Sequence, residues 1–441
     1  MGRAAEIGLR ATGRAGLFER VAAGLPRRVP SGVLSVADQT VASATTFLTG
    51  ALVGRVCSKE EFGLYTLGFS VVTLLMTVQA SLIATPFMVR YPRLTGGDAR
   101  RFAGSSLAHA IAFATLAALV AAGVCAAAIP SDAAPGLTFA VLGAAVGSLL
   151  LRDYVRQTCF ARLAYGRALA LDTVLAALQI AGLAGLYFAG TLRAWSAFLA
   201  LGAACAVTAA HWAVATRGER TFSRGAVLGD LTDSWSSGKW VLASGLVWAV
   251  SMNLYAWIIA AFHGTAMAGT WAAALGVMTL INPLTLGIQN YLGPRIMHAR
   301  ATGGVARLRR EVCVSAALFC AAVLSFAVAM AFVGDGLVTL IYGTKYAGNG
   351  PLVVLVSLNA AVMTVGFAVS RGLFALELAH IDFAVNIAAL AGFLLAGIAL
   401  VRWFGPLGAA AGQLFANTAA TAIRARAFAR MSDRAIRGSA R

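Results

Sequence analysis

Charged residues are scarce in this 441-residue chain. Asp, Glu, Lys and Arg together make up 12% of it, whereas soluble proteins carry roughly 25%. Hydrophobic residues make up 59% and the mean hydropathy is +0.80. This composition argues against an ordinary soluble fold of this length and predicts a membrane protein with several spans.

The sequence also lacks the motifs of several enzyme classes. There is no G-x-x-x-x-G-K-[ST] loop, and the nearest match, Asp233–Trp240, lacks the first glycine and the Ser/Thr. The six cysteines never form C-x-x-C, so we expect packing residues and neither a metal nor a cofactor site. No apolar signal core precedes residue 30, so no cleavable signal is expected.

Long apolar runs fill most of the chain. Since a helical span needs about 20 residues, we predict twelve transmembrane helices. Their expected limits are 34–56, 62–89, 104–129, 135–151, 168–190, 194–216, 240–261, 265–289, 312–333, 350–370, 381–401 and 406–423.

Acidic residues are only half as common as basic ones, 17 against 35, which gives a net charge of +18. Thirty of the 35 cations fall in the N-terminal segment, the even-numbered loops and the C-terminal tail. Arg55, Lys59, Arg193, Lys345 and Arg402 are the other five. Basic residues concentrate on the cytoplasmic side of membrane proteins. We therefore expect both termini in the cytoplasm, and no nucleic-acid partner.

The longest polar stretch between spans, 217–239, divides the chain into two halves of six spans each. We predict a basic cytoplasmic segment, an N-terminal six-helix bundle, a cytoplasmic linker, a C-terminal six-helix bundle and a basic tail. Their limits are 1–33, 34–216, 217–239, 240–423 and 424–441. Segment 1–33 is either an amphipathic surface helix or a disordered arm.

A weak internal similarity supports a duplication. Glu61–Gly97 aligns with Met267–Gly304, and the alignment pairs Gly63 with Gly269. An even number of spans per half makes the two repeats parallel. The expected fold class is thus an all-α polytopic membrane protein of two six-helix bundles around a central cavity.

Arginines end several predicted spans and are the candidate ligands of an anionic substrate. They are Arg55, Arg90, Arg152, Arg295 and Arg371. Guanidinium groups bind phosphates through two hydrogen bonds and stay charged, but the same residues could simply anchor helix ends at lipid headgroups. Asn253, Gln289 and Asn290 offer a polar lining suited to sugar hydroxyls, or hydrogen bonds between helices.

Acids inside the predicted spans need a partner or a function, because a charge is costly in the bilayer. Asp38, beside Gln39, is the most conspicuous one. It is either a proton- or substrate-coupled carboxylate that faces the cavity, or the partner of a cytoplasmic-side arginine that fixes the bundle. Asp172 and Asp382 lie near the cytoplasmic starts of the fifth and eleventh spans. We expect both at the membrane interface, with capping of the helix starts as one role.

Two prolines interrupt predicted spans. Pro86 lies near the end of the second span and Pro283 lies inside the eighth. Proline kinks a helix because it lacks an N–H group. Both are hinge candidates, with a static kink as the alternative.

The region around the first loop resembles a known family. The residues are Ala37-Asp38-Gln39, Thr46-Phe47, Gly54-Arg55 and Glu61-Phe62-Gly63, and Tyr342–Tyr346 followed by Pro351-Leu352 is similar to a later outer loop. They resemble the polysaccharide or O-antigen flippases of the multidrug/oligosaccharidyl-lipid/polysaccharide (MOP) exporter superfamily. The family often has Asn where this chain has Thr46 and Ala where it has Gly54.

The resemblance implies a transporter rather than an enzyme, in the bacterial cytoplasmic (inner) membrane. It would move a lipid-linked oligosaccharide, on undecaprenyl diphosphate, between leaflets by alternating access of two bundles, without a catalytic residue. The implied partners are that substrate, membrane lipids, and a polysaccharide polymerase and glycosyltransferases.

Three other functions compete with this one. A multidrug/cation antiporter of the same superfamily would use membrane carboxylates, of which this chain has few. A lipid II flippase often has additional spans. A membrane glycosyltransferase or polymerase needs a long outer loop with acid/base groups, whereas the longest here, about 334–349, contains one acid, Asp335.

Overall fold

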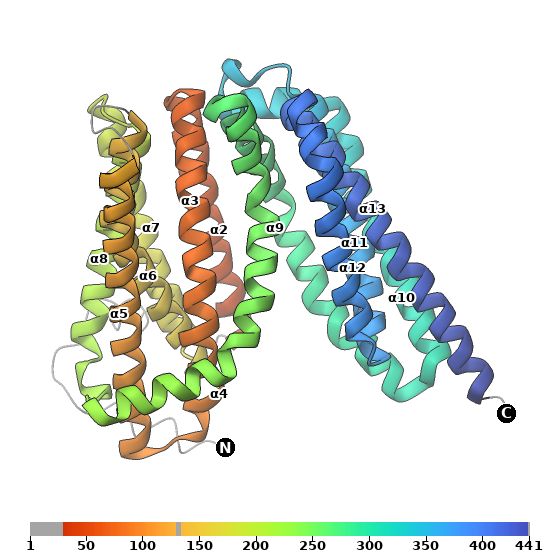
Figure 1. Cartoon of the computed structure of the whole chain (residues 1–441), viewed down its shortest axis with the longest axis horizontal. Coiled ribbons are helices and arrows are strands. Elements are labelled where there is room, and N and C mark those ends of the chain that lie inside the picture. The colour runs from red at the N-terminus through yellow and green to blue at the C-terminus, as the bar shows by residue number, and fades with distance from the viewer. Residues whose placement is uncertain (1–29, 129–133, 440–441) are drawn as a thin grey trace. The chain divides into compact units, whose positions relative to one another are not determined.

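The computed structural model describes residues 30–128 and 134–439, and every regular element within these ranges is a helix. Most of the predicted segment 1–33 lies outside them. Figure 1 labels the helices α2 to α13. They are α2 (Ser31–Val56), α3 (Lys59–Gln79), α4 (Thr85–Arg90), α5 (Gly96–Ala128), α6 (Ala134–Ala161), α7 (Tyr165–Phe188), α8 (Ala194–Ala215), α9 (Arg224–Met278), α10 (Asn282–Tyr342), α11 (Gly350–Ala375), α12 (Ala379–Gly392) and α13 (Ile398–Ser439).

The described residues contain eight helical stretches that are long and apolar enough to cross a membrane. They are Lys59–Arg93, Gly96–Val124, Gly136–Ala161, Tyr165–Phe188, Ala194–Ala215, Gly238–Ile281, Arg295–Tyr342 and Gly350–Ala375. A shorter apolar helix covers His380–Gly392. The chain is therefore an all-helical membrane protein with several spans, as its composition predicts.

Three glycines break the longest helices. Gly264 in α9, Gly304 in α10 and Gly405 in α13 have φ angles of 80°, 65° and 56°. Glycine adopts positive φ without the steric penalty of a Cβ atom. Each break lies between two predicted spans, so each of these long helices consists of two successive helical segments.

The described residues form two units whose boundaries lie inside helices. Unit one contains the residues up to Thr49 together with Gly68–Val250, and unit two contains Gly50–Leu67 together with the residues from Ser251 onward. The end of α2 and the start of α3 thus belong to unit two. The predicted linker 217–239 forms a 3₁₀ turn, Arg217–Glu219, and the first part of α9.

Each unit has its own apolar core. In unit one, Ile83, Tyr154, Leu171 and Trp212 belong to one buried cluster, with the ring centroids of Tyr154 and Trp212 6.4 Å apart. In unit two a buried cluster joins α10, α11 and α13, with the members Ile296, Leu308, Val312, Val369, Leu373 and Phe428. These clusters hold the helices that carry the charged side chains described below.

A π-helical turn, Ala80–Ala84, precedes the buried Pro86 of α4. Proline has no N–H for the carbonyl four residues earlier, at Leu82, and a wider π turn accommodates this missing hydrogen bond. The helix is thus irregular where the sequence predicts a kink. The hinge role of Pro86 stays a prediction.

Helices α3 and α9 cross within unit two at a pair of glycines. A Cβ atom on Gly63 would overlap the carbonyl oxygen of Thr265, and one on Gly269 would overlap the carbonyl oxygen of Lys59. Each glycine therefore contacts the residue four positions before the other. The two glycines that contact each other's helix are the pair that the sequence alignment matches, and the duplication itself stays a prediction.

Candidate functional site

A buried network of ion pairs joins α2, α6 and α7 in unit one. The guanidinium of Arg156 donates from Nη2 to Asp38 Oδ2 at 2.7 Å and from Nε to Asp172 Oδ2 at 2.8 Å. Arg152 donates to the other oxygen of Asp172. Both aspartate side chains are 1% exposed, so these charges depend on one another rather than on water.

The sequence of α6 explains the network. Arg152 and Arg156 are four residues apart, so they lie on the same face of the helix. Two guanidinium groups balance two carboxylates, as buried charges require. Asp38 Oδ1 is buried and accepts no hydrogen bond, which leaves one acceptor of the network available.

Asp38 therefore has an arginine partner, Arg156, as expected for the structural one of its two predicted roles. Gln39 is exposed and donates to Ser43 Oγ at 3.3 Å, and its Oε1 accepts from Arg156 at 3.5 Å. The expectation that Asp172 caps a helix is wrong. It lies well inside α7, whose N-cap is Ala164, because ion pairing with α6 requires a position inside the bundle.

Arg90, at the end of α4, is paired with two acids of the predicted linker. Its Nη2 lies 3.4 Å from Asp230 Oδ1 and 3.3 Å from Asp233 Oδ2, and its guanidinium lies 4.7 Å from the ring centroid of Phe102. Asp230 and Asp233 come from the first turns of α9. Arg90 thus holds the start of α9 against α4 within unit one.

Arg55, in the last turn of α2, and Lys345 connect the ends of α2 and α10 within unit two through hydrogen bonds to backbone carbonyls. Its Nη1 donates to the carbonyl oxygens of Leu340 and Ile341, near the end of α10. Lys345 donates back to the carbonyl oxygens of Arg55, at 3.1 Å, and Cys57. Burial lowers the pKa of Lys345 from its ordinary value. The two cations satisfy carbonyl groups that helix ends leave without partners.

The remaining two candidate arginines have different surroundings. Arg295 donates from Nε to Glu311 Oε2 at 2.9 Å, which ties together the two parts of α10 on either side of Gly304. The guanidinium of Arg371 lies 4.6 Å from the ring centroid of Phe367 and 5.8 Å from that of Phe374. Among the described residues, Arg371 has no carboxylate within ion-pair distance.

A second buried polar group lies between α12 and α13. Arg424 donates from Nε to Asp382 Oδ1 at 2.8 Å and from Nη2 to Asn386 Oδ1 at 2.5 Å. Asn386 in turn donates to Asp382 Oδ2 at 3.2 Å. Asp382 does lie in the first turn of α12, but no side chain caps that helix. Its expected capping role is therefore wrong, because the carboxylate is used by α13.

The predicted sugar-binding residues are only partly described. Asn253 is half-buried in α9. The side chains of Gln289, Asn290 and Pro283 lie outside the described residues, although all three positions belong to α10. Between α11 and α13, Asn417 donates to Asn359 Oδ1 at 2.8 Å, which matches the helix–helix alternative for polar residues in spans.

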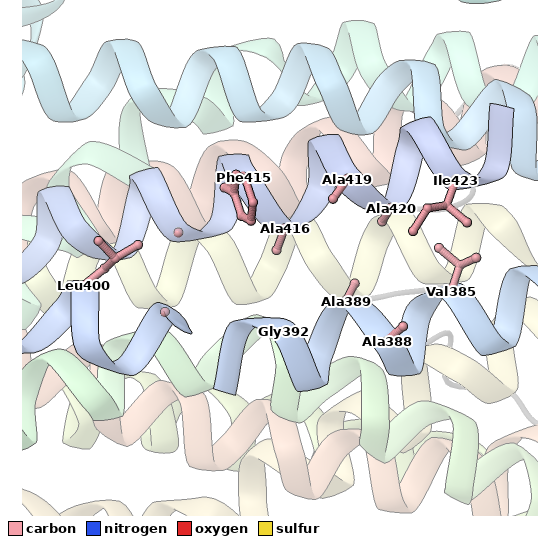
Figure 2. Close-up of a pocket in the computed structure, with 12 residues that line it drawn as sticks. Val385, Ala388, Ala389, Gly392, Leu400, Phe415, Ala416, Ala419, Ala420 and Ile423 are labelled. Atoms are coloured by element: carbon pink, nitrogen blue, oxygen red, sulfur yellow. The ribbon is translucent and has the colours of Figure 1, made fainter. Parts of the chain in front are cut away.

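One cavity of about 120 Å³ lies between α12 and α13. Figure 2 shows Ala388 and Ala389 on one side of it and Ala416, Ala419 and Ala420 on the other. All its lining residues are apolar or glycine. It therefore lacks the charged and polar groups that a diphosphate or a sugar needs. The described residues contain no cluster of side chains suited to a metal ion.

Two arginines that organise these networks could not be recognised as such from the sequence. Arg156 and Arg424 were counted only as cytoplasmic charge, yet each one binds buried acids. For Arg156 the signal was its four-residue distance from Arg152 on one helix face. Arg424 falls one residue beyond its predicted span and had no such signal.

Comparison with known proteins gives a consistent assignment. The family model described as polysaccharide biosynthesis protein matches residues 52–350, which is more than half of the chain. No curated protein matches the chain by sequence.

Several solved structures share the fold. An inward-facing multidrug resistance MATE family transporter of the MOP superfamily has a TM-score of 0.70 at 13% identity, covering 91% of this chain and 99% of its own. The lipid II flippase MurJ in an inward closed conformation has a TM-score of 0.71 at 10% identity, covering 89% and 86%. A MOP superfamily transporter from Pyrococcus furiosus has a TM-score of 0.60 at 12% identity, covering 95% and 97%. Identities this low show the fold alone.

Proposed function

We propose that this chain, which belongs to the polysaccharide biosynthesis protein family, moves a lipid-linked oligosaccharide or polysaccharide precursor across the bacterial cytoplasmic membrane. The observation that carries the proposal is the family match over residues 52–350 in a chain with the MOP transporter fold. Family and fold are those of a transporter and not of an enzyme. The carrier would be undecaprenyl diphosphate, and the product would serve cell-surface polysaccharide synthesis.

The proposed architecture follows the predicted spans. Two six-helix bundles, 34–216 and 240–423, would surround a central cavity that opens to each side in turn. Segments 1–33, 217–239 and 424–441 would lie in the cytoplasm. The asymmetry of 30 cations against five supports this orientation.

Arg371 is the best-supported ligand for the diphosphate among the five predicted arginines. Arg90, Arg152 and Arg295 are engaged by acids, which reduces their attraction for another anion. Arg55 has its donors on backbone carbonyls. Arg371, in contrast, lies beside two aromatic rings and has no carboxylate within ion-pair distance among the described residues. Its forked donors are therefore available to bind phosphate.

This assignment predicts that Arg371→Gln strongly reduces export of a lipid-diphosphate oligosaccharide in proteoliposomes, while Arg371→Lys retains part of it because the positive charge remains. The exposed Arg402 offers a matched control, since Arg402→Gln removes a cation from a predicted outer loop. Equal transport by the two glutamine variants would show that Arg371 is an ordinary interfacial anchor.

Asp38 would couple transport to an ion through its unpaired Oδ1, or fix α2 to α6 through Arg156. For the coupling role we predict that Asp38→Asn impairs flux driven by a pH gradient. Asp98→Asn is the control, because Asp98 belongs to an exposed ion pair with Arg101. Flux of Asp38→Asn that keeps the wild-type dependence on the gradient would assign the residue to structure alone.

The function itself is tested by deleting the gene and locating the lipid-linked oligosaccharide in the two leaflets. We expect it to accumulate in the inner leaflet. Accumulation of unlinked sugars would indicate an enzyme, and loss of drug resistance without any change in glycolipid would indicate the multidrug antiporter. Accumulated lipid II would indicate a lipid II flippase. Arg152 and Arg156 already balance the charges of the buried acids Asp38 and Asp172. These acids therefore offer no free negative charge to a cationic drug, which supports an anionic substrate.

A further inference from the structure

The first turns of α9, residues 224–240, have an unusual distribution of polar and apolar side chains. The polar contacts face unit one: Asp230 binds Arg90, and the carbonyl oxygen of Val227 lies 2.8 Å from His109 Nε2. Before the helix begins, Thr221 N donates to the carbonyl oxygen of Arg100 at 3.0 Å. This segment is thus attached to the protein by its polar face.

Its large apolar side chains are exposed instead. Leu228, Leu231 and Trp235 are 70%, 49% and 54% exposed. They are spaced i, i+3 and i+7, so they form one continuous stripe along the helix. Burying apolar surface stabilises a protein by about 25 cal/mol per Å², so such a stripe would be unfavourable in water.

The position of the segment identifies what covers the stripe. Trp235 lies three residues before Gly238, where the apolar stretch Gly238–Ile281 begins, and α9 is helical without a break up to Gly264. Figure 1 shows this first part of α9 running across the lower ends of α4 and α5 before the helix turns along the spans. The stripe therefore directly precedes the candidate span Gly238–Ile281, where such a span would meet the lipid headgroups.

Charged side chains at both ends of the segment complete the pattern. Arg217 and Arg224 before the stripe and Lys239 after it are all exposed. Cations that flank an apolar face with a tryptophan are typical of helices lying in the headgroup region, where lipid phosphates attract them. A water-exposed loop would need none of these apolar groups.

We infer that residues 224–240 form an interfacial helix whose Leu228–Leu231–Trp235 stripe inserts into the lipid of the adjacent leaflet, while its polar face binds unit one through Arg90. The predicted cytoplasmic linker is therefore a membrane-binding surface. Its partner is the phospholipid headgroup and upper acyl-chain region. This inference does not depend on which substrate the protein carries.

The test uses the full-length protein in nanodiscs of phosphatidylcholine and phosphatidylglycerol, with and without brominated acyl chains. The emission of Trp235 is obtained as the difference between the wild type and Trp235→Phe. We expect brominated lipid to remove most of this emission and aqueous acrylamide to remove little. Trp212, 8% exposed and in the unit-one core, provides the matched control through Trp212→Phe.

Two outcomes would overturn the inference. Strong quenching of Trp235 by acrylamide, without quenching by brominated lipid, would place the stripe in water. Protection from both quenchers would show that protein covers it, either another part of this chain or a second copy. Because Trp235→Phe preserves an aromatic ring, a folded variant is expected, and its elution as a single species on gel filtration checks this.

Discussion

Arg156 offers a direct test of the buried network, because it binds two carboxylates that are 1% exposed. Arg156→Met removes both hydrogen bonds but keeps an unbranched chain of similar length. Asp172 retains Arg152, whereas Asp38 loses its charged partner and becomes an isolated buried acid. Breaking a buried pair from one side costs about 3–5 kcal/mol, and we expect the free energy of unfolding to fall by that amount.

The assay is equilibrium unfolding in mixed detergent micelles with increasing dodecyl sulfate, followed by circular dichroism. Arg101→Met is the control, because the pair Arg101–Asp98 is 54% and 68% exposed and such surface pairs contribute about 0–1 kcal/mol. Adding Asp38→Asn to Arg156→Met should recover part of the loss, since the stranded charge is gone. A loss no larger than that of Arg101→Met, or no recovery in the double variant, would refute the reasoning.

Three glycines give further predictions. Gly405→Ala should lower stability by about 1–3 kcal/mol, because its φ of 56° and ψ of −134° strain any residue with a Cβ. Gly185→Ala, at an open helical position, should instead be neutral or raise stability by about 0.5–1 kcal/mol. Gly63→Ala should reduce the yield of monodisperse protein on gel filtration, since its Cβ would overlap the carbonyl oxygen of Thr265. A Gly63→Ala yield equal to that of Gly185→Ala would contradict the close crossing.

The helical segments could be predicted from the sequence because the length of apolar runs is itself the physical requirement for a span. Even the breaks at Gly264, Gly304 and Gly405 fall between predicted spans. The start of α9 could not be predicted in this way. Residues 217–239 are polar and rich in glycine, which is typical of a loop, and their helix is held in place by tertiary contacts with Arg90 and His109.

The candidate site was less predictable. The sequence indicates that Asp38 needs an arginine but cannot select it, because Arg156 is 118 positions away and Arg152 is an equally good choice on the same face. Arg90 lies at the end of a span, where a ligand for phosphate is expected. Its acidic partner Asp230, however, lies in another helix, 140 positions later in the chain. Spacing reveals which residues share a helix face, whereas pairing between helices depends on their packing.

The crossing of α3 and α9 has the local geometry of a homodimer interface within a single chain. In a two-fold symmetric dimer, residue i of one copy contacts residue j of the other and the reverse contact is identical. Gly63 against Thr265 and Gly269 against Lys59 repeat this relation. In a half-length protein, one substitution at this glycine would damage both contacts at once. In this single chain Gly63 and Gly269 have separate codons, so the two sides of the crossing can change one at a time.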